Sequence, residues 1–263
     1  AYGHPYSLGG LVPGNSYDVY VRADCGGGNE SEWSGPVSFR VPCAPATVTA
    51  TAPYTEDFAA YGGTSASSTS GVMPDCWDML FFGTLNHLGY APHVFYGGSY
   101  APNGNNNNCL LMYAGSTDYG PSSYAILPQF TNDLATLEID FSVAMSTNFS
   151  SPRLSLGYLS DMTDANTFVA IQTFPNNLVS ENGVADYQIR LDGGTYPAGA
   201  RLCFRWTASW ESCYIDDVVV RLIPSCIAPD DLAYSNLTSG GVLLEWTPAG
   251  SESAWEIDYG TVG

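Results

Sequence analysis

The sequence predicts an all-β protein organised around a two-sheet β-sandwich. Stretches such as Leu8–Cys25 alternate apolar and polar residues, with the period of two that a strand with one buried face requires. The 28 Gly and 17 Pro among 263 residues supply turns between many short strands. No stretch has a convincing helical period. These three observations favour stacked antiparallel sheets over a helical architecture.

Net charge and cysteine content restrict the function classes. The formal net charge is −19, with seven Arg and no Lys, and so acidic a surface repels nucleic acid and anionic membranes. No apolar run approaches the ~18 residues of a membrane helix, so we expect neither a nucleic-acid partner nor membrane insertion. Seven Cys without a CxxC pair or a Cys/His zinc cluster are typical of a secreted or cell-surface chain with disulfides.

One disulfide is predicted from strand placement. The turn "TAS" (207–209) separates two predicted strands, Ala200–Trp206 and Ser212–Leu222. If they form a hairpin, Cys203 and Cys213 lie directly opposite each other, which predicts a cross-strand bridge.

The sequence of residues 43–223 carries a family resemblance. The stretches "EDF" (56–58), "PDCW" (74–77), "GYLSDMTDANTF" (157–168) and "YIDDVVV" (214–220) follow one another in the family's order. They resemble jelly-roll adhesin domains related to MAM domains and to the cleaved adhesin domains of gingipains. The resemblance implies a jelly roll whose first and last strands pair. The remaining predicted strands are Tyr124–Phe130, Ala135–Met145, Pro152–Phe174 (interrupted by a turn) and Ala185–Leu191; Asn103–Asn108 is expected to be an exposed loop.

The same resemblance implies a second disulfide and a metal site. Cys43 and Cys76 match two early cysteines of the MAM-like pattern, which would leave Cys109 unpaired; Cys76–Cys109 is the alternative. The family's structural calcium maps onto four acidic residues of the first and last strands: Glu56, Asp57, Asp216 and Asp217. Calcium takes six to eight hard oxygen ligands at flexible angles. The alternative is that these are solvated edge carboxylates that discourage strand addition.

Both ends of the chain resemble parts of a fibronectin type III module, in the style of Bacteroidetes surface proteins. "GLVPGNSYDVYVRADCG" (10–26) and "SEWSGPVSF" (31–39) look like its last three strands, with a tyrosine corner at Tyr17. Residues 226–260 look like its first three strands. The inward residues there would be Leu232, Val242, Leu244, Trp246, Trp255, Ile257 and Tyr259. The predicted organisation is therefore 1–42, a C-terminal half module; 43–223, the jelly roll; and 224–263, an N-terminal half module.

Two half modules would each expose an apolar face and an unpaired edge. Closing them within one chain would stretch Cys43–Pro53 to full extension at about 3.3 Å per residue. We therefore expect them to join between successive copies, head to tail, with Cys25 bonded to Cys226 of the neighbour. Such a contact makes a filament or marks the repeat of a longer chain. The alternatives are a purely structural filament subunit and a circularly permuted module closed within one chain.

Enzyme signatures are missing from the sequence. It has three His (His4, His87 and His93), and no GxSxG elbow, HExxH motif or phosphate loop followed by Lys. No catalytic residue is predicted. Trp206 and Trp210 flank a turn and could stack on sugars, although most such rings fill cores. The sequence thus predicts a non-catalytic extracellular adhesin segment that binds neighbouring copies, flanking repeats, or a host or environmental glycan or protein. The alternative is a carbohydrate-binding module of a secreted glycan-degrading enzyme.

Overall fold

The computed structural model describes most of the chain as two compact units, residues 1–222 and 223–263. The residues described are 3–63, 72–81, 91–96, 101–102, 108–114, 122–145, 153–175, 183–207, 209–224, 226, 228–250 and 252–261. For 114 and 209–211 only the backbone is described. Within this part of the chain no helix has the length and hydropathy that a membrane span requires.

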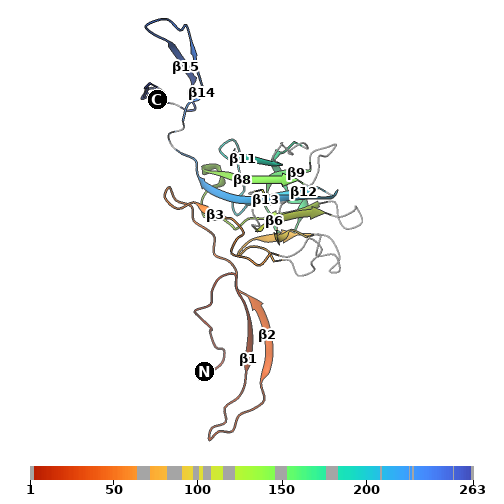
Figure 1. The fold of residues 1–263 in the computed structure, drawn as a ribbon. Coiled ribbons are helices and arrows are strands. Elements are labelled where there is room, and N and C mark those ends of the chain that lie inside the picture. Colours follow the sequence, from red (N-terminus) through yellow and green to blue (C-terminus); the bar gives the residue numbers. More distant parts are fainter. Residues whose placement is uncertain are drawn as a thin grey trace. The chain divides into compact units, whose positions relative to one another are not determined.

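The first unit contains the predicted sandwich of two antiparallel sheets (Figure 1). The six-stranded sheet has the order β11-β8-β13-β6-β5, and β3 pairs with β13 beside this path. The five-stranded sheet has the order β10-β9-β12-β7-β4. Strands of the first sheet are β3 (Tyr54–Glu56), β5 (His93–Tyr96), β6 (Asn108–Ala114), β8 (Leu137–Met145), β11 (Val184–Arg190) and β13 (Ser209–Leu222). Those of the second are β4 (Asp78–Leu80), β7 (Ser122–Ile126), β9 (Leu154–Leu159), β10 (Val169–Thr173) and β12 (Arg201–Thr207).

Strand β13 organises the first sheet. Its 14 residues pair with β6 and β8 along the first half and with β3 and β8 along the second. The partners of Tyr54 and Glu56 are Val220 and Val218, so the first and last strands of the jelly roll pair as expected. In the described residues the only helical elements are two short 3-10 turns, Leu134–Thr136 and Ala165–Thr167. The all-β prediction is confirmed.

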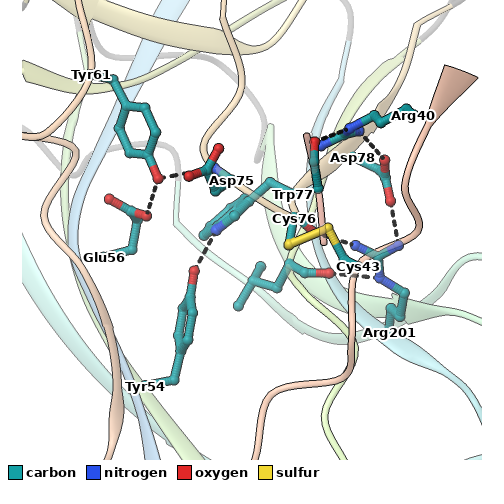
Figure 2. The surroundings of a disulfide bond; sticks show 12 residues. Arg40, Cys43, Tyr54, Glu56, Tyr61, Asp75, Cys76, Trp77, Asp78 and Arg201 are labelled. Carbon is teal, nitrogen blue, oxygen red and sulfur yellow. Dashed lines mark hydrogen bonds and ion pairs between the residues drawn. A yellow bond between two sulfur atoms is a disulfide. The ribbon is translucent and has the colours of Figure 1, made fainter. Parts of the chain in front are cut away.

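Alternation along the strands builds the core between the sheets. In β8, Ile139, Phe141 and Val143 point inward and are buried. The Phe141 ring meets Phe204 of the opposite sheet edge-on, with 4.9 Å between ring centroids. Aromatic pairs prefer this edge-to-face arrangement. At the sheet end, Trp77 donates its Nε1–H to the Tyr54 hydroxyl at 2.6 Å, as Figure 2 shows. The core is therefore continuous from one sheet to the other.

The flanking segments each contain one two-stranded sheet. In the first unit, β1 (Ser16–Val21) pairs with β2 (Ser34–Arg40), and the backbone N–H of Val12 donates to the Tyr17 hydroxyl at 2.9 Å. This contact is the predicted tyrosine corner. In the second unit, β14 (Asp230–Ser235) pairs with β15 (Leu243–Thr247). Three strands were expected at each end, but the described residues form two at each.

The disulfide predictions have different outcomes. Cys43 and Cys76 are bonded, as expected, with their Cα atoms 5.5 Å apart. The expected Cys203–Cys213 bridge is wrong, since both are free and buried. Cys203 lies on β12 in the five-stranded sheet and Cys213 on β13 in the six-stranded sheet. The chain crosses from one sheet to the other at the turn rather than closing a hairpin.

The disulfide lies where the first hairpin joins the sandwich (Figure 2). Arg201 reaches the Cys76 carbonyl at 3.0 Å, the Leu127 carbonyl at 2.7 Å and the Asp78 carboxylate. Gly14 has φ +84, and a Cβ there would lie 3.2 Å from the Cys43 sulfur. This turn therefore requires glycine both for its backbone and for its approach to the disulfide.

Thiol accessibility tests the cysteine arrangement. Cys109, Cys203 and Cys213 are buried, and burial raises the pKa of each thiol, so the reactive thiolate is both rare and shielded. We expect iodoacetamide to label these three only after denaturation. Non-reducing peptide mapping should link Cys43 to Cys76. A peptide joining Cys203 to Cys213 would contradict the fold.

Candidate functional site

The four acidic residues predicted to bind calcium come from two adjacent strand ends. Glu56 ends β3, and its ladder partner on β13 is Val218. Asp216 and Asp217 lie in β13, where the register with β8 shifts between Asp216 and Val219. Asp217 has φ +50, the left-handed backbone of a bulge residue. The bulge keeps Ile215 and Val218 in the core.

Asp216 is the most unusual carboxylate in this group. Its side chain is fully buried. One oxygen, Oδ1, accepts from the Asp217 N–H at 2.9 Å, whereas Oδ2 has no hydrogen-bond partner among the described residues. The pKa of Asp216 is raised to about 7, chiefly by burial; the hydrogen bond from the Asp217 N–H opposes the rise, and the negative charges of Asp217, Asp57 and Glu56 add to it. A buried acceptor without a partner costs about 1–3 kcal/mol.

The other two carboxylates on the β3 side are used by the local backbone. Glu56 accepts from the Phe58 N–H at 2.8 Å and from the Tyr61 hydroxyl at 3.3 Å, and Figure 2 shows the second contact. Burial raises the pKa of Glu56 despite these bonds. Asp57 accepts from the Ala59 N–H at 3.1 Å. Both carboxylates are therefore held in place, and both are close enough to Asp216 to affect its charge.

The fit of this group to a cation is partial. Calcium requires six to eight oxygens, and the described residues contain no group of three or more His, Cys, Asp or Glu side chains placed to hold a metal. Oδ2 of Asp216 nevertheless has no hydrogen-bond partner among the described residues. Two further acidic residues lie near it, and a hard cation bound there would supply the missing interaction. The arrangement is a cluster of mutually repelling carboxylates and not a ready-made cage.

The predicted sugar platform is wrong for Trp206. That ring is fully buried in the core between the two sheets, because it has the same strand parity as the buried Phe204 on β12. A buried ring cannot stack on a sugar. The side chain of Trp210 lies outside the described residues, as do His87 and the tract 103–107. Of the other histidines, His93 is buried, with its Nδ1 2.8 Å from the Ala91 carbonyl oxygen.

The second unit contains an open apolar groove of about 810 Å³. Trp246 of β15 and Trp255 stack edge-on across it, with 5.5 Å between ring centroids. Its lining includes Leu232, Leu244, Ile257 and Tyr259. These residues were expected to point into a module core, yet Leu232 is 71% exposed and Tyr259 is 92% exposed. Leu232 and Leu244 belong to the β14–β15 sheet, whereas Ile257 and Tyr259 lie in the segment that follows it, and no other described residue of this unit covers these side chains.

The first hairpin has an equivalent exposed face. Tyr17 and Phe39 are cross-strand neighbours whose rings stack with 6.1 Å between centroids. Val37, opposite Val19, is 67% exposed. On the loop side, the Arg22 guanidinium lies 4.6 Å from the Trp33 ring centroid. Apolar residues of a strand pair thus face solvent at both ends of the protein.

A polar groove on the six-stranded sheet escaped the sequence analysis. Its volume is about 480 Å³, and its lining includes Asp140, Ser142 and Asp186. Arg221 pairs with both Glu138 and Asp140 across the strands. The alternation in "LEIDFSV" (137–143) contains the signal, since Glu138, Asp140 and Ser142 share the face opposite the core. These groups largely satisfy one another, so they form a structural network.

Comparisons with known proteins add only weak likenesses. No protein-family model and no curated protein matches the chain. Among solved structures, it is similar to the K2 cleaved adhesin domain of Lys-gingipain, with 14% identity, a TM-score of 0.45 and 66% of this chain and 99% of that chain covered. The K1 domain from Porphyromonas gingivalis gives 17% identity, a TM-score of 0.41 and coverages of 65% and 99%. A xylan-binding domain from Paenibacillus barcinonensis gives 12% identity and a TM-score of 0.37, with 66% of this chain and 95% of that chain covered.

Likenesses at this level carry no argument about what the chain binds. The class that the geometry itself defines is a jelly-roll sandwich whose two flanks each expose one apolar sheet face.

Asp216 makes stability depend on pH. In the unfolded chain its carboxyl ionises near the ordinary pKa of 3.8, but the folded group keeps its proton until about pH 7. The unfolded state therefore binds fewer protons across this window, and stability falls as pH rises from about 4 to about 7. In EDTA, Asp216→Asn should remove this decline and raise the free energy of unfolding at pH 8 by about 1–3 kcal/mol.

The measurement is urea unfolding at several pH values. Asp230→Asn, at an exposed position of β14, is the matched control and should leave the profile unchanged. If Asp216→Asn destabilises the protein at pH 8 in EDTA, the buried carboxylate is not the source of the decline.

Proposed function

We propose that this chain is a non-catalytic extracellular adhesion segment whose half modules are completed head to tail by neighbouring copies, in a filament or repeat array. The observation that carries the proposal is the pair of uncovered apolar sheet faces, one on the first hairpin and one on the second unit. The Cys43–Cys76 disulfide supports an oxidising, extracellular setting.

Both flanks expose many large apolar side chains. The second unit exposes the large apolar residues Leu232, Tyr234, Leu237, Val242, Leu243, Leu244, Trp255, Ile257 and Tyr259, and residues 3–42 expose Tyr6, Leu8, Val12, Tyr20, Val21, Trp33, Val37 and Phe39. These side chains lie on both faces of their two-stranded sheets and in turns, because consecutive residues such as Leu243 and Leu244 point to opposite faces. A partner that covers one face would therefore cover part of this set, and a standard interface buries about 800 Å² per partner.

A second copy is the occupant that supplies both missing parts. Each flank is a two-stranded sheet, which is marginal by itself in water, and each has an uncovered apolar face. When the hairpin of one copy joins the second unit of the next, both apolar faces at that joint are covered. Only the two terminal copies of the assembly each keep one uncovered flank. Such a contact is heterologous and propagates.

Concentration-dependent assembly tests this function. We expect light scattering to show species larger than a monomer, growing with protein concentration, and Ile257→Glu to reduce the association constant at least tenfold, because it places a charge on the apolar face. Val169→Glu is the matched control, since Val169 is also an exposed aliphatic residue (47%) but lies on the edge strand β10. A monodisperse monomer at all concentrations would refute the proposal.

The two exposed thiols provide a covalent readout of the same joint. Cys25 and Cys226 are both free and exposed. Joining them between copies forms one S–S bond and releases two protons and two electrons, which glutathione disulfide accepts to become two glutathione molecules. With this oxidant we expect a ladder of covalent multimers on non-reducing gels. Cys25→Ser should abolish the ladder.

Calcium is proposed as the structural ion of the jelly roll. The support is the buried, unpartnered Asp216 Oδ2 beside Asp57 and Glu56; Asp217 completes the proposed set. A bound cation would neutralise their repulsion and tie β3 to β13. At about 100 times its dissociation constant, calcium would stabilise the fold by about 2.7 kcal/mol.

Chelation tests the calcium proposal. EDTA should lower the melting temperature of the wild-type protein, and Asp57→Asn and Asp217→Asn should remove that sensitivity. An unchanged melt in EDTA, together with no calcium by elemental analysis, would reject the ion.

Glycan binding by a carbohydrate-binding module remains the alternative function. With Trp206 buried, it rests on Trp210. Binding on a glycan array that is lost on Trp210→Ala, in a protein that does not assemble, would favour this alternative.

A further inference from the structure

We propose that the joint forms by strand addition: residues 254–259 of one copy pair antiparallel with the free edge of β1 in the next copy. This inference rests on the head-to-tail assembly above and assigns its contacting strands and register.

The acceptor is the regular edge of the first hairpin. Among the described residues, β1 pairs only with β2, so its other edge presents unpaired N–H and C=O groups. The outer edge of β2 is a poorer acceptor because Pro36 has no N–H. The ladder irregularity also lies on β2, since Val19 and Val21 pair with Val37 and Ser34. Edge strands of this kind, without proline or bulge, are templates for another strand.

The donor segment has the sequence of a strand without having a partner. Residues 254–259 alternate strictly, with Trp255, Ile257 and Tyr259 on one face and Glu256 and Asp258 on the other. None of them belongs to a β-ladder in the described structure. The Trp255 ring is fixed against Trp246, whereas Ile257 is 55% exposed. The segment is therefore anchored at one end and unpaired along its length.

Charge selects the register. Apolar side chains of the donor must share a face with Val19 and Val21 to cover the apolar side of the hairpin. If Ile257 lies opposite Val19, Asp258 faces Asp18, and like charges directly opposite each other are destabilising. Moving the donor by two residues places Ile257 opposite Val21.

In that register the polar side chains are also compatible. Asp258 lies opposite Tyr20, which removes the repulsion, and Glu256 lies opposite Arg22, the residue that follows β1. Arg22 already pairs with Glu30 and packs on Trp33, so Glu256 would join that cluster as a second acidic partner. Arg22 is one of only two positive charges in residues 1–42, and residues 223–263 contain none. The positive side chain next to this edge therefore lies near an acidic residue of the donor.

Disulfide trapping tests both the strands and the register. In a Cys25→Ser/Cys226→Ser background, Val21→Cys and Ile257→Cys are introduced together, and glutathione disulfide serves as oxidant. The expected result is a ladder of covalent multimers, formed at least tenfold faster than with the matched pair Val19→Cys and Ile257→Cys. Both positions are on the same face of β1, so the pairs differ only in register.

Each outcome decides a different claim. If the background protein assembles by light scattering but neither pair cross-links, strand addition is wrong while head-to-tail assembly stands. Faster trapping by the Val19 pair overturns the register. A fast-migrating monomer with an internal disulfide shows closure within one chain and overturns the inference. If the background protein does not assemble at any concentration, the proposed function itself fails.

Discussion

A sheet with one apolar face is stable in water only when something covers that face, and this constraint governs every part of the protein. In the sandwich the two sheets cover each other, and aromatic contacts such as Phe141 against Phe204 close the space between them. At both ends the same alternation of residues builds sheets with apolar side chains that the described residues leave exposed. The flanks therefore have the sequence of a core and the exposure of a surface, and this contrast is the physical basis for assembly.

Within the sandwich, β13 is the strand with the most neighbours in its sheet. This strand pairs with β3, β6 and β8, so its residues are buried on almost all sides, including Asp216. A bulge keeps the apolar residues on either side of the acidic pair facing inward. The cost is a buried carboxylate whose second oxygen has no hydrogen-bond partner among the described residues. A strand that joins the first and last parts of the domain thus also concentrates its least favourable electrostatics.

Much of this fold is readable from the sequence. Period-two alternation locates β8, β11, β12 and β13 to within a few residues, and the turn before Tyr17 predicts its hydroxyl contact. The pairing of β3 with β13 and the Cys43–Cys76 bond agree with the family resemblance. These features depend on local pattern or on motif order, which the sequence records directly.

The errors have a common physical origin. Two strands on either side of a short turn look like a hairpin, and nothing in "TAS" reports that the chain passes from one sheet to the other there. Hence Cys203 and Cys213 were paired wrongly. The predicted sugar contact of Trp206 rests on its nearness to the turn, although its parity with Phe204 on β12 indicates burial. The exposed faces of the flanks are not among these errors, because a half module lacks the strands that would cover its apolar face, and the sequence predicts that exposure.

The position of the Cys43–Cys76 bond has a mechanical consequence. The two cysteines are 33 residues apart, and they connect the root of the first hairpin to the entry of β4. When tension is applied through the hairpin, the bond transmits it to residue 76 and bypasses the segment between. An extended chain spans at most about 3.3–3.6 Å per residue. The bond therefore prevents an extension on the order of 110 Å by the residues between the two cysteines. A pull through the hairpin therefore reaches β4 directly and bypasses β3, which lies between the two cysteines.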